Sequence, residues 1–222
     1  MADTRRVTAA VLLIGDEVLS GRTQDRNLQQ IAQFLAPLGI NVIEARTVPD
    51  IEDEIVEAVN TLRAKADYVF TTGGIGPTHD DITADSIAKA FGMTIDVRAD
   101  ALAIIEEWYD KTKTPVTESR KRMARIPEGS SLIKNPVTGA PGFQTGNVFT
   151  MAGVPAICRG MLEDIAHRLE GGTVTLSRSV KGDNLREGEI AEKLGVLQEE
   201  NPNVSIGSYP YFIEVKAGEV RR

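Results

Sequence analysis

The chain has 222 residues, of which 41% are hydrophobic and 26% charged, as is typical of a soluble globular protein. This length allows one large domain, or one domain and a small appendage. The formal net charge of −7 argues against nucleic acid as a partner, because broad binding to phosphates needs a basic face. The single cysteine, Cys158, excludes an internal disulfide framework. Without a signal-like start or a long apolar run, we expect a cytoplasmic protein with no membrane partner.

Strand-like and helix-like segments alternate through the first two thirds of the chain. Asp50 is placed to cap a helix at its N-terminus, and Gly92 is placed to end one. Apolar runs predict strands at 7–14, 40–48 and 67–72, and shorter strands at 132–133 and 148–151 that bracket a loop over 135–146. Apolar residues at helical spacing predict helices at 27–38, 51–62, 84–91, 98–113, 117–125 and 161–169.

This alternation predicts a mostly parallel sheet with helices on both faces. In such sheets ligands bind at the carboxyl ends of the strands, so loops that follow strands are expected to share one rim. Here those loops are 15–17, 73–81 and either 135–142 or 153–155. All of them are rich in Gly, Pro, Asp or Asn, as a ligand-binding rim would be.

The glycine-rich run at 71–83 is the most informative part of the sequence. It follows an apolar strand and precedes a helix, and its three glycines allow backbone N–H groups to approach an anion such as phosphate. Asp80 and Asp81 add two carboxylates beside that anion, which favours a divalent cation as cofactor. The alternative is a plain strand-to-helix turn that needs glycine, before a helix whose first turn favours aspartate.

Three stretches together resemble the MoaB/Mog-type molybdopterin-binding domain. They are the run at 71–81, the opening loop 14–21 with Asn27, and the late loops 135–143 and 151–155, which come in the family's order. The branch they resemble is found at the N-terminus of competence/damage-inducible protein A and in the molybdopterin-binding-like domain of eukaryotic FAD synthase. The resemblance spans residues 7 to about 169.

The resemblance implies a three-layer α/β/α fold that is often a homo-oligomer. In this branch it implies hydrolysis of a nucleotide pyrophosphate such as ADP-ribose or FAD, with a divalent metal cation. In the molybdenum-cofactor branch the same fold adenylylates or binds molybdopterin. The chain has Ala152 where many members have proline and Ile157 where many have an acidic residue, which argues against an acid or base in the late loop.

The candidate catalytic and metal-binding residues are therefore Asp81 and Asp80. Asn27 is expected either to orient a phosphate or ribose or simply to start a helix, and His79 is expected to donate a hydrogen bond. The basic run 119–125 is expected to be a solvated helix face, or else to send one arginine to a substrate phosphate. The candidate substrate-binding residues are Gly15, Asp16, Glu17, Asn27, Thr72, Gly73, Gly74, Gly76, Pro77, Thr78, Asn135, Gly139, Ala140, Pro141, Gly142, Gly153, Val154 and Pro155.

Three functions are compatible with these residues. The first is a metal-dependent nucleotide pyrophosphatase, in which the glycine loop holds one phosphate and the acid pair places the cation. The second is a pterin- or nucleotide-binding module for molybdenum-cofactor assembly, without hydrolysis. The third is a regulatory protein that senses a nucleotide, which the two retained acids disfavour.

The pattern changes at Gly171 and Gly172, so we predict a main domain over 1–170 and a small α+β appendage over 171–222. The appendage is predicted to hold strands at 173–180, 204–208 and 211–215 and a helix near 187–200. So few elements bury little apolar surface. We expect the appendage to be either truncated or completed by a partner chain, giving a homo-oligomer.

Overall fold

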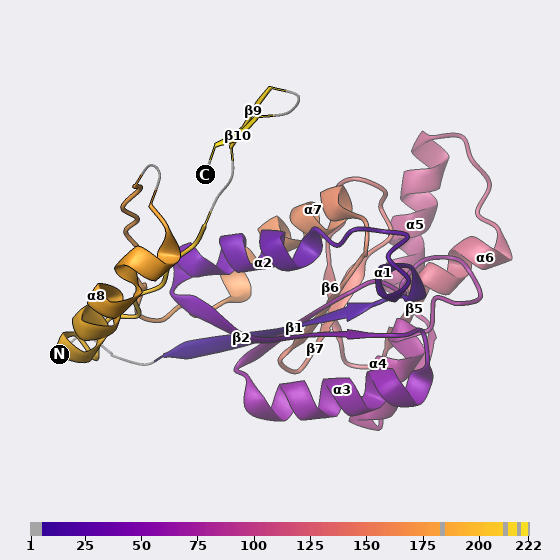
Figure 1. Ribbon diagram of the computed structural model, residues 1–222. Coiled ribbons are helices and arrows are strands. Elements are labelled where there is room, and N and C mark those ends of the chain that lie inside the picture. The colour runs from indigo at the N-terminus through magenta and orange to yellow at the C-terminus, as the bar shows by residue number, and fades with distance from the viewer. Residues whose placement is uncertain (1–5, 183–184, 211–212, 217–218, 222) are drawn as a thin grey trace. The chain divides into compact units, whose positions relative to one another are not determined.

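A computed structural model describes residues 6–182, 185–210, 213–216 and 219–221 (Figure 1). The chain divides into two compact units, residues 1–175 and 176–222. Within the described residues, none of the helices has the length and hydropathy of a membrane-spanning segment.

The first unit is built on a six-stranded sheet in the order β2-β1-β3-β8-β7-β6. The pairs β2–β1, β1–β3 and β3–β8 are parallel, and β8–β7 and β7–β6 are antiparallel. The mostly parallel sheet predicted from the sequence is confirmed. The strands are β1 (Val7–Ile14), β2 (Ile40–Val48), β3 (Tyr68–Thr72), β6 (Ser131–Ile133), β7 (Gly142–Thr145) and β8 (Val148–Met151).

Helices cover both faces of this sheet (Figure 1). On one face α3 (Glu52–Lys65) and α4 (Thr83–Phe91) pack against Ala10, Leu12 and Ile14 of β1, and α5 (Ala99–Lys111) adds to the same core. On the other face α2 (Asn27–Leu35) and α7 (Pro155–Ile165) pack against the alternate β1 residues, among them Val11 and Leu13. Successive strand residues point to opposite faces, so a strand that is apolar throughout must be covered twice. The three-layer α/β/α fold is confirmed.

Two strand predictions were wrong in the main domain. The strand β7 lies inside the predicted loop 135–146, because the antiparallel partners β6 and β8 take up a segment that glycine and proline mark as a turn. A second small sheet pairs β4 (Ile95–Val97) with β5 (Arg125–Pro127), and the sequence did not indicate it. The predicted helix 117–125 is therefore shorter: α6 (Glu118–Lys121) is followed by the 3₁₀ turn η2 (Arg122–Ala124) and then by β5.

The helix ends follow local chemistry with one exception. Gly92 ends α4 with φ 64°, as predicted, because glycine accepts the left-handed conformation. The prediction that Asp50 caps α3 was wrong: Ile51 occupies the N-cap position, and the Asp50 carboxylate accepts a hydrogen bond from Asp16 N at 3.1 Å. The remaining short helices are α1 (Asp16–Leu19), η1 (Ala36–Leu38) and η3 (Ala166–Arg168).

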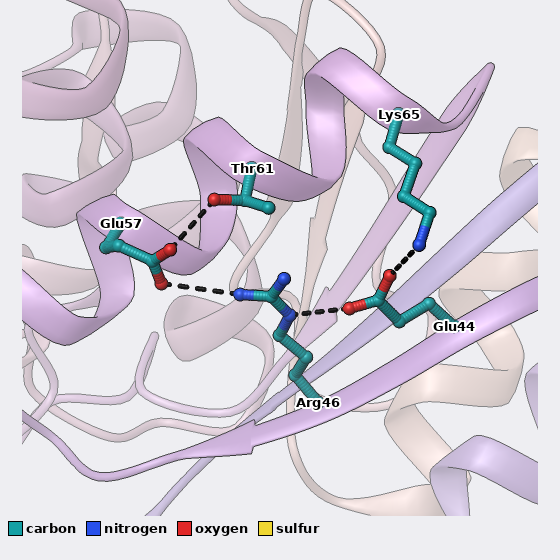
Figure 2. Close-up of polar contacts among 5 residues, drawn as sticks. All are labelled: Glu44, Arg46, Glu57, Thr61 and Lys65. Carbon is teal, nitrogen blue, oxygen red and sulfur yellow. Dashed lines mark hydrogen bonds and ion pairs between the residues drawn. The ribbon is translucent and has the colours of Figure 1, made fainter.

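A charged network ties the edge strand β2 to α3 (Figure 2). Glu44 accepts from Arg46 Nε at 2.7 Å and from Lys65 Nζ at 2.6 Å, and Arg46 also reaches Glu57 at 3.3 Å. The hydrogen bond from Lys65, with that from Arg46, holds the pKa of Glu44 below its ordinary value. Charged side chains on an edge strand oppose pairing with another chain, so this network protects the open side of the sheet.

The second unit contains α8 (Glu187–Glu200) and the antiparallel pair β9 (Ile213–Lys216) and β10 (Glu219–Arg221). The predicted helix near 187–200 is present. The predicted strands 173–180 and 204–208 were wrong, because these segments pair with no described strand and most of their apolar side chains are exposed, Val180 by 99%. The predicted strand 211–215 begins outside the described residues, and β9 covers its end.

Candidate functional site

The ends of β1, β3 and β8 bring three loops to one rim. Gly15 N donates to Val48 O at 3.1 Å, and Gly73 N donates to Met151 O at 3.1 Å. A Cβ placed on Gly153 would lie 3.3 Å from Gly73 Cα, so the backbones of these two loops touch. The opening loop, the glycine loop and the late loop 153–155 therefore share the rim, as the parallel topology requires.

The conformation of the glycine loop is imposed by its neighbours. Gly73 has φ 105° and Gly74 has φ 65°, which side chains other than glycine rarely adopt. A Cβ on Gly73 would overlap Ile14 O, and a Cβ on Gly74 would overlap Thr83 Oγ1. Thr83 then holds the loop by donating from its N to Gly74 O at 3.0 Å and from its hydroxyl to Gly73 O at 2.9 Å.

The two acids after the loop have different settings. Asp81 Oδ2 accepts from Thr78 N at 2.8 Å and from the Thr78 hydroxyl, so its carboxylate is oriented by its own loop. Gly76 gives this carboxylate room, because a Cβ there would meet Asp81 Oδ2 at 2.7 Å. The Asp80 side chain is 64% exposed and lies 3.9 Å from His79 Nδ1. The Thr78 side chain holds the pKa of Asp80 below its ordinary value.

The metal prediction stays a prediction. Among the described residues no group of three or more His, Cys, Asp or Glu side chains could hold a metal ion. The donor set of Asp80 and Asp81 is nevertheless chemically suitable, because Mg²⁺-like ions are often bound by one or two carboxylates together with oxygens of a phosphate ligand.

Asn27 joins the opening loop to the two other loops. Its Nδ2 donates to Gly153 O at 2.7 Å and to Thr72 Oγ1 at 3.2 Å, although Gly153 is 126 residues away in the sequence. Asp25, not the Asn27 side chain, supports the start of α2 by accepting from the N–H of Asn27 at 3.0 Å. Asn27 does begin α2, which was one of the two roles expected for it, and its side chain also joins these loops.

The loop 135–142 is organised mainly by its own residues. Asn135 is buried; its Oδ1 accepts from Val137 N at 3.0 Å and its Nδ2 donates to Ala140 O at 2.8 Å. Gly139, with φ 80°, lies against the ring of Trp108. Of the candidates in this loop, Pro141 lines a pocket with the glycine loop, whereas Gly142 belongs to β7.

Two pockets flank the glycine loop. The glycine-loop pocket encloses about 330 Å³, including its open mouth, and its lining includes Gly74, Gly76, Asp81, Asp85, Arg122, Arg125 and Pro141. The Asn27 pocket encloses about 370 Å³, also including its mouth. It is lined by Leu13, Ile14, Glu17, Val18, Thr23, Gln24, Asp25, Arg26, Asn27, Thr72, Gly153 and Pro155.

The arginines of the basic run 119–125 have different surroundings. Arg120 stacks over the Tyr109 ring at 4.3 Å. Arg125 pairs with Asp85, whose hydrogen bond raises the pKa of the arginine. Arg122 lines the glycine-loop pocket and is exposed, and its side chain makes no hydrogen bond or ion pair within the described part of the chain. The sequence indicated that one arginine of this run could reach a phosphate but did not indicate which one.

Asp50 is a rim residue that the sequence analysis missed. It lies just after the carboxyl end of β2. Burial raises the pKa of its carboxyl group, and the negative charges of Asp16, Glu17 and Asp80 raise this pKa further. The hydrogen bond from Asp16 N acts in the opposite direction. Its position after a strand was the available signal, but an aspartate before an amphipathic helix is usually interpreted as an N-cap.

Residues 10–171 match the model of a family described as a probable molybdopterin binding domain. The chain belongs to this family. Residues 177–218 match a second model, the middle domain of FAD synthase. These matches confirm the predicted resemblance to the MoaB/Mog-type domain.

Relatives from other organisms agree with this assignment. A protein of Pyrobaculum calidifontis is 37% identical over 218 residues, which cover 95% of this chain and 83% of the relative. A CinA-like protein of Citrifermentans bemidjiense is 36% identical over 203 residues, which cover 87% of this chain but only 49% of the relative. The crystal structure of CinA from Thermoplasma acidophilum, a protein of unknown function, is 35% identical and covers 72% of this chain and 98% of its own, with a TM-score of 0.67.

Proposed function

We propose that the first unit binds a phosphate-bearing nucleotide or pterin, as a binding module of the molybdopterin-binding family. The observation that carries the proposal is the juxtaposition of the glycine loop, at the start of α4, with the unpaired guanidinium of Arg122 in one pocket. Backbone N–H groups at a helix start favour an anion, and a guanidinium can bind phosphate oxygens in pairs.

The net charge of the chain makes these local groups necessary. At −7 the protein as a whole repels an anionic ligand, so affinity must come from donors at the site. Asp85 does not cancel Arg122, because its carboxylate is already paired with Arg125. Asp81, the other carboxylate of the pocket, accepts from Thr78, so Arg122 is the arginine without an ion pair that can meet a phosphate beside Gly74 and Gly76.

Calorimetric titration with inorganic pyrophosphate and ADP tests this proposal. Arg122→Ala should weaken the binding of both ligands about tenfold or more, because a charge-assisted hydrogen bond contributes about 1.5–3 kcal/mol. Arg120→Ala is the matched control, since it removes an arginine of the same run that stacks on Tyr109 outside the pocket. Equal affinities of the wild type and Arg122→Ala would refute the assignment of Arg122, and no binding of either ligand to the wild type would refute the proposed function.

A second candidate function is hydrolysis of a nucleotide pyrophosphate such as ADP-ribose or FAD. The observation that favours it is the gathering of carboxylates on the rim, where Asp16, Glu17 and Asp80 act on the ionisation of Asp50. No three described acidic side chains lie close enough to hold a metal ion by themselves, so a cation here would also need oxygens of the ligand phosphates. A divalent cation, when bound, would neutralise the pyrophosphate and lower the pKa of an attacking water.

The residues of the chain would have distinct parts in such a reaction. Thr78 orients the carboxylate of Asp81, and the exposed Asp80 lies beside it, so these two acids would hold the cation against the ligand phosphates. Glu17 lines the neighbouring Asn27 pocket and would face the other end of the ligand. His79 is almost fully exposed and would only donate to the ligand.

Product chromatography separates hydrolysis from binding. The wild type would be incubated with ADP-ribose, FAD or NADH in the presence of Mg²⁺, Mn²⁺ or Co²⁺, and the nucleotide products would be separated and quantified. Hydrolysis predicts monophosphate products that depend on the cation. Tight binding without products under every condition would eliminate the hydrolase and leave the binding module.

A further inference from the structure

One buried polar atom at the rim has no partner. Asn27 is 4% exposed, and its Oδ1 makes no hydrogen bond with any described residue. Two other side-chain atoms share this condition, the hydroxyls of Thr71 and Thr150. These two residues are opposite each other in the β3–β8 ladder and line neither pocket, whereas Asn27 lines a pocket.

The orientation of the Asn27 amide is determined by its surroundings. Gly153 O is a carbonyl oxygen that can only accept, so the group 2.7 Å from it must be the Nδ2 of Asn27. The Oδ1 atom is then the one left without a donor, and exchanging the two ends of the amide would leave Gly153 O facing another acceptor. A buried acceptor without a donor destabilises a protein, so a ligand donor that reaches this oxygen by displacing the groups that now shield it gains affinity.

The rest of the Asn27 pocket favours the same kind of ligand group. Its charged side chains are two carboxylates, Glu17 and Asp25, and one guanidinium, Arg26, so the pocket is net acidic. It therefore disfavours phosphate more than the glycine-loop pocket does, where Arg122 and Arg125 balance Asp81 and Asp85. The Asn27 pocket is lined by Thr72, which precedes the glycine loop, and by Gly153, whose backbone touches Gly73, so a ligand with its phosphates at the loop can place an uncharged part there.

We propose that Asn27 Oδ1 accepts a hydrogen bond from an uncharged O–H or N–H group of the ligand and so selects its non-phosphate part. This inference rests on the proposed function, because it takes the phosphates to lie at the glycine loop. The donor is either a sugar hydroxyl or an amino group of the heterocycle. Asn27 is thus a specificity residue: it distinguishes a nucleotide or pterin with a donor at this point from an analogue without one.

Calorimetry on the full chain tests the inference with four probes: pyrophosphate, ADP, 2′,3′-dideoxy-ADP and IDP. Pyrophosphate reports the glycine loop alone. Dideoxy-ADP lacks the sugar hydroxyls, and IDP lacks the amino group of the base. For the wild type we expect ADP to bind about tenfold more tightly than the one analogue that lacks the recognised donor, which identifies the donor.

The variant Asn27→Ala should reduce that tenfold ratio to about one while leaving pyrophosphate affinity unchanged. The matched control is Asn147→Ala, which removes another partly buried asparagine whose Nδ2 donates to two backbone carbonyls, those of Arg63 and Ala66, outside both pockets. This control should keep the ratio. A purely structural role for Asn27 predicts that all four probes weaken equally.

If Asn27→Ala does not fold, the wild type still decides the question. In protein labelled with ¹⁵N-asparagine, the side-chain amide signal of Asn27 should shift with ADP and not with the analogue that lacks the donor. Equal affinity for ADP, dideoxy-ADP and IDP with intact pyrophosphate binding overturns this inference alone. No binding of pyrophosphate or ADP overturns the proposed function and this inference with it.

Discussion

Individual side chains at the rim hold the loops together as well as offering groups to a ligand. Asp81 illustrates this, because its carboxylate accepts two hydrogen bonds from Thr78 and also belongs to the acid pair expected to hold a cation. Losing activity on removal of Asp81 would therefore not by itself distinguish chemistry from loop support. Substitutions that separate the charge from the hydrogen bonds are needed.

Asp81→Asn provides this separation, since it keeps an acceptor oxygen for Thr78 but removes the charge. If Asp81 places a catalytic cation, both Asp81→Ala and Asp81→Asn should reduce turnover of ADP-ribose by about 100-fold or more. If Asp81 only supports the loop, Asp81→Asn should remain active. Initial rates measured with folded variants, checked by circular dichroism, decide between the two roles, and near-normal turnover by Asp81→Ala would remove this residue from the catalytic proposal.

Asp50 makes a pH-dependent prediction. Its carboxyl pKa is raised in the fold, by burial first and by neighbouring carboxylates next, so the ionised form costs stability at neutral pH. That cost is present above the folded pKa and disappears as the pH falls below the ordinary aspartate value of about 3.9. Asp50→Asn, which still accepts from Asp16 N, should raise the melting temperature at pH 7 and lose this advantage below about pH 4.

Glu44→Gln is the control for that experiment, because the fold lowers the pKa of Glu44 whereas it raises the pKa of Asp50. The pKa of Glu44 is lowered by Lys65 and Arg46, so its stabilising effect is present at neutral pH and is lost as the pH falls. Thermal unfolding of both variants should be measured between pH 3 and 7. At pH 7 the melting temperature should be higher than that of the wild type for Asp50→Asn and lower for Glu44→Gln. Equal melting temperatures for Asp50→Asn and the wild type at pH 7 would contradict the burial argument.

At the scale of elements, the glycine loop connects β3 to α4, and its glycines are needed for different reasons. Gly74 lies in the left-handed region and meets Thr83, so it serves the fold directly. Gly76 has no such backbone requirement and instead gives space to the carboxylate of Asp81. The loop is thus both a necessary turn and a candidate binding element.

Alanine substitutions should reveal this division. Gly74→Ala should lower stability by about 1–2 kcal/mol or more, because alanine resists a positive φ and its Cβ overlaps Thr83. Gly76→Ala should displace the Asp81 carboxylate and weaken pyrophosphate binding with a smaller change in stability. Urea unfolding and calorimetry on the same preparations measure both effects. A larger loss of stability for Gly76→Ala than for Gly74→Ala would contradict the assignment.

At the scale of the whole molecule, the second unit raises the question of assembly. None of the residues of α8 is buried, although Ile190, Leu194 and Leu197 lie at the spacing of one helical face. Leu197 on this face is 46% exposed, and Ile190 and Leu194 are half-buried, so the face needs a further cover. We propose that a second copy of the chain provides it, in a twofold homodimer.

Light scattering measures this directly. At tens of micromolar the wild type should have twice the chain mass of 24.1 kDa. Leu197→Asp should shift the mass toward that of one chain, because it places a charge on the apolar face of α8, while Glu192→Gln on the same helix should not. A wild type that is monodisperse at the mass of a single chain would contradict the homodimer.

The amino-acid sequence alone determined the layers of the main domain and indicated where its candidate site lies. Apolar strands alternating with amphipathic helices permit little except a covered parallel sheet, and the glycine run between β3 and α4 indicated a ligand loop at its carboxyl edge. Helix 187–200 was equally readable, because its periodicity is local. These features depend on neighbours within a few residues.

Only the tertiary structure decided which side chains meet at the rim. The contact of Asn27 with Gly153, the approach of Arg122 to the glycine loop and the placing of Asp50 beside Asp16 join residues far apart in the chain. The strand β7 and the β4–β5 sheet likewise form because a partner strand lies beside each strand. Segments 173–180 and 204–208 have no such partner among the described strands, so they stay outside the sheets. Strand pairing and loop contacts join residues that are far apart in the sequence, so they cannot be predicted from local composition.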